Sequence, residues 1–466
     1  MPSFVVKEYT PGDAQKVADL MNASDAGWPG GLMRGSVMAA EEVTRWHERE
    51  KSLAVYLCHR GNEVVGYCSL HGRASNRDNA YVGFLNARPD VHGQGVGRRL
   101  LLRCVDTATR MGFGRLDLHT WAANMKAVPL YKKTGFWWVP DTAVYMQNYL
   151  PTILREPLGS DFFRRHDWYQ HYQRELALVE DRQRWHGREV FQYRWAADGE
   201  AMEFTIDREA RGITGFEDRR MLVGCVVPRD ELPSGLTHSA RWFFVNKGRR
   251  PMEIVLLATS ERGIELDIER RMTVTRRKTL NERFAIRADV EDKDWDSPAH
   301  IITSRLVVDG QPLTLRSGFR VVPPVEFSFD SCGRLTPGVR QKVMLVVNNR
   351  MEAEVTGRAY LTPAPDLRLT RRCVDFTLHP HGRKSYPLRA QADSTDAHSI
   401  TVRARFERGG EAGEIRARPH HLHAAPPGVA TVAVRERDLT LENDLLSLHI
   451  PFKGDSIPVW DIFRRR

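Results

Sequence analysis

Residues 86–104, "NARPDVHGQGVGRRLLLRC", place Gly93, Gly95 and Gly97 directly before an amphipathic, basic helical pattern. The first N–H groups of an α-helix have no acceptor within the helix, and the helix start carries a partial positive charge. Glycines allow these N–H groups to close around an anion because no Cβ stands in the way. The stretch therefore predicts a helix start that binds phosphate.

Phosphate-binding glycine motifs differ in spacing, and two of them fit this stretch less well. A P-loop needs GxxxxGK followed by Ser or Thr, which the sequence lacks. A dinucleotide-binding fold needs GxGxxG, but Arg98 stands where the third glycine should be. Asp117 follows about 20 residues later, as that motif requires, so the dinucleotide alternative stays open.

The third motif matches best. In "ARPDVHGQGVGRRLL", Pro89 lies in a turn after a strand, and Gly95 and Gly97 occupy two positions reserved for small residues. This pattern resembles the first signature of the GNAT N-acetyltransferases, (Gln/Arg)-x-x-Gly-x-(Gly/Ala). His92 replaces the usual Gln or Arg, which leaves the backbone cradle intact but changes one side-chain contact.

A second stretch strengthens the resemblance. "NMKAVPLYKKTGF" is similar to the second signature of the same family, with Asn124, Ala127 and Tyr131 at the matching positions. The expected order of elements in residues 1–150, β-α-α-β-β-β-α-β-α-β-β, also agrees. The resemblance implies that this third of the chain is an α/β domain with a mixed sheet, and that it transfers an acetyl group from acetyl-CoA to a primary amine.

The resemblance also implies a set of site residues. The strand Leu85–Ala87 is expected to splay from its neighbour, so that its backbone pairs with the pantetheine arm and polarises the thioester carbonyl. Tyr131 is expected to protonate the leaving thiolate, and Asn124 to contact the cofactor or to orient its helix. No metal is expected. The cofactor-binding residues implied are Leu85, Asn86, Ala87, His92, Gly93, Gln94, Gly95, Val96, Gly97, Arg98 and Asn124.

The general base is less well defined by the sequence. Many family members carry a Glu on the strand before the glycine loop, but "YVGFLNA" has none. His119, on the next expected strand, is the first candidate because an unperturbed histidine titrates near neutral pH. His71 and Asp78 are weaker candidates. The acceptor amine is not predicted, because acceptor contacts come from loops such as residues 24–35, "SDAGWPGGLMRG", which resembles a lid.

The rest of the chain is expected to be mostly β-structure. A stripe of Phe162, Tyr169, Tyr172, Leu176 and Val179 predicts a bridging helix over 160–185. From about residue 190 the hydrophobic period becomes two, with turn residues between short strands, which is typical of antiparallel sandwiches. The expected divisions after 1–150 are a linker with the bridging helix at 151–189, Ig-like sandwiches at 190–322 and 323–417, and a linker with a C-terminal strand segment at 418–466.

The composition limits which partners and which cellular location the sequence predicts. The net charge of +10 is spread among interleaved acidic residues, so nucleic acid is not the expected partner. No apolar run reaches the length of a membrane span, and the start lacks a secretory signal pattern. Six cysteines without a CxxC pair favour reduced thiols and a cytoplasmic location. The expected acceptor is a small-molecule or glycan amine, and the sandwiches could bind that substrate or a protein partner.

Two further motifs and two rival functions remain. "EDKDWDSP" at 291–298 spaces acidic residues as a calcium loop does but lacks its glycine and its final Glu, so a solvated hairpin is favoured. "HHLH" at 420–423 is read as an unliganded part of a Pro-rich linker.

The sandwiches also resemble, at fold level, modules of carbohydrate-active enzymes. The rival functions are a catalytically idle CoA sensor or scaffold, and a fragment of a carbohydrate-processing protein.

Overall fold

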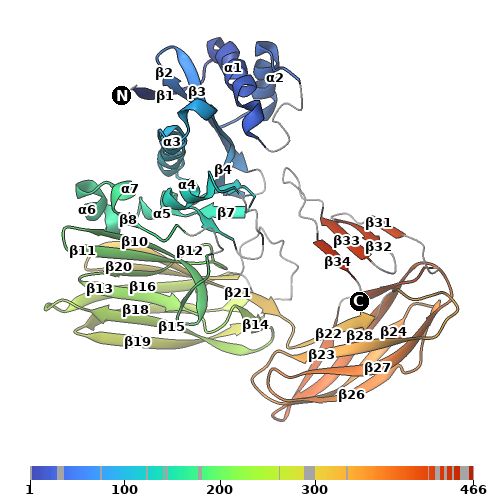
Figure 1. Cartoon of the computed structure of the whole chain (residues 1–466). Helices are drawn as coiled ribbons and strands as arrows, with labels where there is room; N and C mark the ends of the chain where they lie inside the picture. The colour runs from blue at the N-terminus through green and yellow to red at the C-terminus, as the bar shows by residue number, and fades with distance from the viewer. Residues whose placement is uncertain are drawn as a thin grey trace.

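The computed structural model consists of an N-terminal α/β domain, two larger β units and a small C-terminal sheet (Figure 1). The described residues are 3–28, 36–73, 76–121, 124–139, 142, 145–176, 181–261, 263–287, 300–331, 334–417, 419–425, 431–434, 438–442, 446–451 and 461–464.

The N-terminal domain is built on a seven-stranded mixed sheet in the order β1-β2-β3-β4-β5-β7-β6. All neighbouring strands are antiparallel except β4 and β5, which are parallel. The mixed sheet predicted for residues 1–150 is therefore confirmed. The strands are β1 (Phe4–Glu8), β2 (Ala54–Arg60), β3 (Glu63–Arg73), β4 (Asn76–Ala87), β5 (Arg115–His119), β6 (Trp137–Trp138) and β7 (Tyr145–Asn148).

Helices cover both faces of this sheet. Successive side chains of a strand point to opposite faces. In β2, Tyr56 belongs to the core under α3, whereas Leu57 belongs to the core under α1 and α2. The α-helices of the domain are α1 (Ala14–Ser24), α2 (Ala40–Glu50), α3 (Val96–Arg110), α4 (Val128–Lys133) and α5 (Leu150–Ile153), and the short 3-10 turns are Pro11–Asp13, Asp25–Gly27 and Pro89–Val91.

The single bridging helix expected over 160–185 is wrong. The structure has α6 (Pro157–Arg165), α7 (Trp168–His171) and then a short strand, β8 (Tyr172–Gln173). The helix stops because His166 is extended, at φ −129° and ψ 134°, and because the Asp167 side chain accepts from the Gln170 N–H to start a new helix. The spacing of the aromatic residues is helical, but the Asp167 cap starts a new helix, so the segment forms two short helices.

The first β unit consists of a nine-stranded and a five-stranded sheet that share one hydrophobic core. Ig-like modules have seven to nine strands in all, so this unit is larger than the Ig-like sandwich expected for 190–322. The larger sheet holds β8, β9 (Gln183–Trp185), β10 (Arg188–Ala197), β11 (Glu200–Asp207), β12 (Gly212–Asp218), β13 (Met221–Val226), β15 (Thr237–Asn246), β17 (Ile264–Glu265) and β19 (Arg277–Ile286). The smaller holds β14 (Glu231–Pro233), β16 (Met252–Ser260), β18 (Asp267–Val274), β20 (His300–Val308) and β21 (Gln311–Val322).

The second β unit has a four-stranded and a five-stranded sheet around its own core. One sheet contains β22 (Val325–Ser331), β23 (Gln341–Asn349), β25 (Leu367–Leu369) and β27 (Arg383–Ala392), and the other β24 (Val355–Pro363), β26 (Cys373–Leu378), β28 (Ala397–Arg408), β29 (Glu411–Arg416) and β30 (His420–His423).

The expected boundary at residue 418 is wrong, because β30 pairs with β28 and so belongs to the second unit. Strand pairing takes precedence there over the local composition of Pro, His and Gly. The expected C-terminal strand segment forms a sheet of its own, made of β31 (Thr431–Val434), β32 (Asp438–Glu442), β33 (Leu446–Pro451) and β34 (Asp461–Arg464).

The N-terminal domain and the first β unit share a continuous core. The ring of Phe191 on β10 lies 5.5 Å from Trp137 and 6.1 Å from Tyr149, measured between centroids. The Tyr193 hydroxyl accepts from the Tyr149 N–H at 2.8 Å and donates to the Gly135 carbonyl at 2.8 Å. The second β unit contributes to a separate core cluster. The N-terminal domain and the first β unit are therefore expected to unfold together.

In the described ranges, no helix is both long and apolar enough to cross a membrane. The five cysteines that lie in these ranges are free thiols, four of them buried.

Replacing Phe191 by Ala tests the shared core. Its ring is fully buried, and a buried Phe→Ala change costs about 3–5 kcal/mol. We expect urea unfolding, followed by hydrogen exchange and mass spectrometry, to show earlier loss of protection in both the N-terminal domain and the first β unit. Phe376→Ala, in the separate core, is the matched variant and should weaken the second β unit alone. Loss confined to the first β unit in Phe191→Ala would contradict a shared core.

Candidate active site

The parallel pair β4 and β5 separates soon after it forms. The two strands are paired only at Asn79–Arg115, Ala80–Leu116 and Tyr81–Asp117. Beyond Tyr81, residues 82–87 of β4 pair with β3 alone. The β4 backbone groups that face β5 in this stretch therefore have no strand partner, which creates the splay predicted beside Leu85, Asn86 and Ala87.

A β-bulge accompanies the splay. Leu70 of β3 pairs with Val82 and Ser69 pairs with Phe84, so Gly83 is an extra residue in β4. Bulges bend the strand that carries them and redirect its side chains. A Cβ on Gly83 would stand 2.4 Å from the His71 Nε2, so only glycine leaves room for that ring.

The glycine loop has a backbone conformation that favours glycine at two of its positions. Gly93 and Gly95 have φ values of 77° and 81°, a left-handed region that other residues rarely adopt. Gly95 is the N-cap of α3, so the free N–H groups of the first turn lie just after it. A Cβ on Gly93 would meet no atom within 4 Å, so the loop faces open space there.

The side chains of the loop stabilise the turn. The His92 Nε2 lies 2.9 Å from the Ala87 carbonyl oxygen, and the Gln94 Nε2 donates to the Asp90 carbonyl at 3.0 Å. His92 therefore ties the end of β4 to the loop, in place of the contact that a Gln or Arg would make. Both side chains are exposed, so neither fills the helix start.

Gly97 allows α4 to approach the start of α3. A Cβ on Gly97 would lie 3.0 Å from the Leu130 Cδ2 on α4, closer than ordinary packing. Val96 is buried in the core, whereas Arg98 is exposed and directs its guanidinium back toward Gly95, 3.1 Å from the position of a Cβ there. The third glycine thus serves helix packing, while the first two serve the loop.

Asn124 is a capping residue at the start of α4. Its Oδ1 accepts from the Ala127 N–H at 3.2 Å, and its Nδ2 donates to the Thr120 Oγ1 at 3.0 Å. Of the two roles expected for Asn124, these contacts correspond to orienting the helix. They fix the start of the segment that carries Tyr131.

Tyr131 lies in a buried setting close to the splay. Its side chain is 8% exposed, and its ring centroid is 6.0 Å from that of Phe136. Burial raises the pKa of Tyr131 well above that of a free phenol, with smaller effects in the same direction from Cys68 and Tyr81. The phenol is therefore protonated throughout the neutral range, as a proton donor must be.

His119 lies at the point where the two strands part, two residues beyond the last paired residue of β5. Its Nδ1 is 3.1 Å from the Tyr81 hydroxyl across the splay, and its ring is 4.8 Å from that of Tyr145. Tyr81, which sequence reasoning missed, thus connects His119 to β4. A tyrosine in a strand without a motif gives no signal that could have found it.

The two weaker base candidates differ in position. His71 is hydrogen-bonded to the Ser69 hydroxyl at 3.0 Å, and burial lowers its pKa more than Glu50 raises it, so the ring is neutral near pH 7. Asp78 is exposed near the opposite end of β4, where its carbonyl accepts from the Gly114 N–H. His71 is therefore close to the bulge, and Asp78 is distant from the splay.

A buried ion pair fixes β5. The Arg115 Nε donates to the Asp117 Oδ1 at 2.6 Å, and the Tyr145 hydroxyl on β7 donates to the Asp117 Oδ2 at 2.5 Å. The Asp117 side chain is 0% exposed. Asp117 consequently cannot reach a ribose, and the dinucleotide alternative that depended on it is wrong.

An aromatic wall lines the splayed part of β4 and was not predicted. We define it as Trp28, Phe84 and Trp121. Trp28 stacks on Phe84 at 5.1 Å between centroids and lies 6.4 Å from Trp121. The Trp28 indole N–H also lies 3.4 Å from the Asn86 Oδ1. The loop 24–35 thereby contacts the strand at its described end; residues 29–35 lie outside the described residues.

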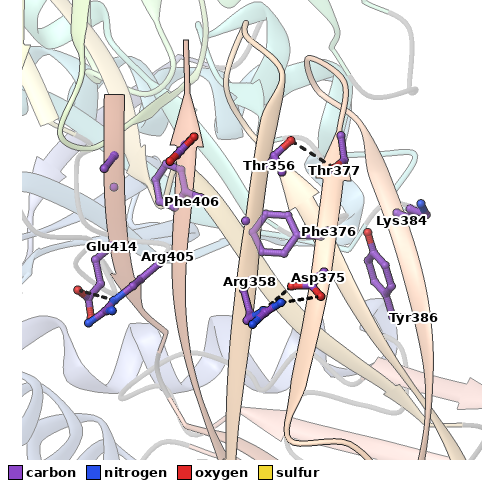
Figure 2. Close-up of a pocket in the computed structure, with 14 residues that line it drawn as sticks. Thr356, Arg358, Asp375, Phe376, Thr377, Lys384, Tyr386, Arg405, Phe406 and Glu414 are labelled. Carbon is purple, nitrogen blue, oxygen red and sulfur yellow. Dashed lines mark hydrogen bonds and ion pairs between the residues drawn. The ribbon is translucent and has the colours of Figure 1, made fainter. Parts of the chain in front are cut away.

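A hollow of about 930 Å³ lies elsewhere, in the second β unit (Figure 2). Arg358 pairs with Asp375 at its edge, and Phe376 and Phe406 lie in its wall. A Cβ on Gly357 would stand 2.5 Å from the Arg405 carbonyl oxygen and 2.8 Å from the Cζ of the Phe376 ring. The rings are at most 9% exposed, so they fill the space above glycine instead of presenting a binding face.

The described residues contain no group of three or more His, Cys, Asp or Glu that could hold a metal. The "HHLH" stretch is strand β30, in which successive side chains alternate between faces. The calcium-like loop 291–298 lies outside the described residues.

Comparison with known proteins identifies the N-terminal domain. Residues 19–136 match the model of the acetyltransferase (GNAT) family. This part of the chain is a GNAT acetyltransferase domain, as its two signatures predicted.

Similar individual proteins are also acetyltransferases. The [ribosomal protein bS18]-alanine N-acetyltransferase of Escherichia coli K12 is 38% identical over 64 residues, which is 14% of this chain and 40% of that protein. The chain therefore spans less than half the length of this curated relative.

Among solved structures, a ribosomal-protein-alanine N-acetyltransferase from Brucella melitensis is 18% identical, covering 31% of this chain and 99% of that one, with a TM-score of 0.27. The PaiA N-acetyltransferase of Thermoplasma acidophilum, in complex with coenzyme A, is 16% identical, covering 32% and 99%, with a TM-score of 0.25.

Replacing Asp117 by Asn tests whether the buried ion pair supports the site. The change removes the carboxylate that Arg115 and Tyr145 bind in a buried place, and breaking a buried ion pair costs about 3–5 kcal/mol. We expect the free energy of unfolding of the unit formed by the N-terminal domain and the first β unit to fall by that amount in urea. Asp106→Asn is the matched control, because Asp106 pairs with exposed Arg103 and Arg110 on α3, and it should change stability by less than about 1 kcal/mol. Equal effects from both variants would show that burial does not govern this pair.

Proposed function

We propose that the chain is an acetyl-CoA-dependent N-acyltransferase that acts on a primary amine by direct attack on the thioester. The single observation that carries the proposal is the geometry of the glycine loop. Two left-handed glycines, Gly93 and Gly95, open the start of a 15-residue helix at the same edge where β4 leaves β5. A binding site for a diphosphate thus adjoins a strand with free backbone groups.

The residues present fit the diphosphate of acetyl-CoA. The N–H groups after Gly95 have no intrahelical acceptor, and the helix start favours an anion. A Cβ at Gly95 would approach the Arg98 guanidinium, so a side chain there would compete with the anion for this space. In the proposal, the backbone of residues 93–98 and the Arg98 side chain hold the diphosphate, and Leu85–Ala87 hold the pantetheine arm.

Acetyl-CoA supplies a thioester, from which an amine takes the acetyl group while the thiol departs. In the proposal, a backbone N–H of the splayed part of β4 donates to the thioester carbonyl and stabilises its developing negative charge. Tyr131 donates its phenolic proton to the leaving sulfur. The phenol carries its proton near pH 7, although burial raises its pKa and so makes it a weaker acid toward the thiolate.

The attacking amine must lose a proton, and His119 is the proposed acceptor of that proton. Its ring lies at the splay, and its Nδ1 is occupied by the Tyr81 hydroxyl. A neutral imidazole at this position can accept a proton from the amine, directly or through water. His71, beside the bulge, is the second candidate, and its lowered pKa keeps it neutral at the working pH.

The proposed acceptor is a primary amine on a small molecule, glycan or protein. The E. coli relative is named for acetylating the alanine of a ribosomal protein, so a peptide N-terminus belongs in any acceptor panel. The aromatic wall beside β4 suits the apolar part of an acceptor. The β-sandwich modules are proposed to bind that substrate or a protein partner.

Replacing Gly95 by Glu tests acetyl-CoA binding. The carboxylate would enter the cradle and repel the diphosphate. We expect roughly millimolar acetyl-CoA to raise the Tm of the wild-type chain, since a ligand at about 100 times its Kd stabilises by ~2.7 kcal/mol. The Tm of Gly95→Glu should not respond.

Gly410→Glu is the matched control, because Gly410 also has a positive φ, of 86°, and no atom stands within 4 Å of its added Cβ. It carries the same kind of backbone strain in the second β unit, between β28 and β29, and should respond as the wild type does. A wild-type chain that shows no stabilisation by acetyl-CoA would count against the whole proposal.

Replacing Tyr131 by Phe tests the proton donor. We expect kcat to fall at least about 100-fold, while the Kd for acetyl-CoA stays within about twofold of the wild type. Transfer is measured by mass spectrometry on a panel of alkylamines, amino sugars and an N-terminal alanine peptide. Tyr56→Phe is the control, because that hydroxyl bonds the Thr107 hydroxyl at 2.7 Å within the core, and it should keep full activity.

An unchanged kcat in Tyr131→Phe would remove Tyr131 from the chemistry. Binding of acetyl-CoA without turnover of any amine would favour the idle sensor instead of the enzyme.

A further inference from the structure

Asn246, the last residue of β15, joins two arginine-containing turns at one end of the first β unit. Its Nδ2 donates to the Arg250 carbonyl at 2.7 Å, in the turn between β15 and β16. Its backbone N–H donates to the Arg276 carbonyl at 2.7 Å, in the turn between β18 and β19. Asn246 is 9% exposed, so one buried residue holds the two turns side by side.

The two turns carry four exposed arginines, which we call the arginine turns: Arg249, Arg250, Arg276 and Arg277. Within the part of the chain that the structure describes, their side chains form no ion pair and no hydrogen bond. By contrast, Lys247 beside them pairs with Glu217 at 2.7 Å. Like charges in neighbouring turns repel one another, so this end of the unit favours the approach of an anionic group.

The second β unit repeats the arrangement around Asn349, the last residue of β23. The Asn349 Nδ2 donates to the carbonyl four residues later at 2.8 Å, as the Asn246 Nδ2 does. The Asn349 Oδ1 accepts from the N–H two residues later at 2.9 Å, and so does the Asn246 Oδ1 at 2.9 Å. The Asn349 Nδ2 also bonds a second turn, at the His379 carbonyl. The turns that follow the two asparagines are therefore structurally equivalent.

In the second β unit, this turn is a contact surface between domains. Glu352, three residues after Asn349, pairs with Arg229 of the first β unit at 3.1 Å. Arg249 is three residues after Asn246 and so has the equivalent position with the opposite charge. The correspondence indicates that the Arg249 turn suits a carboxylate where the Glu352 turn takes a guanidinium.

The arginine turns lie at the end of the first β unit that is remote from the second. In β13, Met221 pairs with Asn246, and the strand runs from there to Val226. The chain then continues through Arg229, which contacts the second β unit, into β14. Figure 1 shows β14 on the side of the first β unit that faces the second one. The contact to the second unit therefore leaves the arginine turns exposed.

We propose that the arginine turns are a docking surface for a segment rich in Asp and Glu on another protein. A guanidinium binds a carboxylate through two parallel N–H donors. Single-stranded nucleic acid, the other polyanion to consider, is usually held by aromatic rings on which its bases stack. Residues 247–251 and 275–278 contain no aromatic residue, so the acidic protein segment fits better. The inference is independent of the acetyl transfer proposed above.

The test measures binding of a fluorescein-labelled oligoglutamate peptide to the full chain by fluorescence polarisation, without acetyl-CoA. The double variant Arg249→Glu/Arg276→Glu should weaken binding at least about tenfold, because it places carboxylates opposite carboxylates. Raising the salt concentration from about 50 to about 300 mM should weaken binding by the wild type. Thermal unfolding checks that the variant is folded, and the exposed positions of both arginines leave the core intact.

Arg403→Glu/Arg416→Glu is the matched control. These two arginines face each other on β28 and β29 and are exposed. As far as the chain is described, they have no ion pair either. The control changes the net charge by the same amount in the second β unit, and it should alter the affinity for oligoglutamate less than about twofold.

Every other outcome overturns the proposal. A wild type that does not bind oligoglutamate, or equal weakening by both double variants, removes any special role of the arginine turns. Tighter binding of oligothymidylate, lost in Arg249→Glu/Arg276→Glu, would make the surface a nucleic-acid site. A wild-type dimer that becomes monomeric in that variant, measured by light scattering, would make the occupant a second copy of the chain. The Tm response to acetyl-CoA, measured separately, tells failure of this docking surface from failure of the proposed function.

Discussion

The separation of β4 from β5 is the constraint on which the rest of the site depends. Two parallel strands that stayed paired would use all of their facing backbone groups on each other. Here the pairing stops after Tyr81, and Gly83 adds a bulge at that point. The groups of residues 82–87 that face β5 are released, and the chain then turns through Pro89–Val91 into α3. Free strand amides and free helix amides are thus delivered to one place by a short stretch of backbone.

Rigidity around the splay comes from buried pairs instead of from the strand ladder. Arg115, Asp117 and Tyr145 tie β5 to β7 just before His119, and the Asn124 cap fixes the start of α4 before Tyr131. Strands that are not paired with each other tend to fray. These buried contacts take the place of the strand-to-strand hydrogen bonds that are missing between β4 and β5. The shared core with the first β unit adds to this, since Tyr193 binds both Gly135 and Tyr149 on either side of the β6–β7 edge.

Much of the N-terminal domain could be predicted because its signals are local. Gly93 and Gly95 need left-handed φ values, and Tyr131 follows a capping Asn at helical spacing, so short motifs carry that information. The remaining features depend on contacts between distant segments. The split of α6 from α7 depends on His166 and Asp167, which a hydrophobic stripe does not record. Similarly, the Trp28–Phe84 stack joins residues 56 positions apart, and β30 was hidden within a Pro- and His-rich stretch.

The β region also contributes to the packing of the GNAT domain. A GNAT domain that stood alone would expose Trp137 and Tyr149, which are 2% and 1% exposed here. The first β unit covers them through Phe191 and Tyr193, and the segment leading into it places Tyr169 beside Arg98 and Lys133. The same attachment therefore buries apolar surface of the GNAT domain and brings an aromatic ring to the start of α3. A change in the packing of β10 would therefore reach the start of α3 through α7, without any alteration of the glycine loop itself.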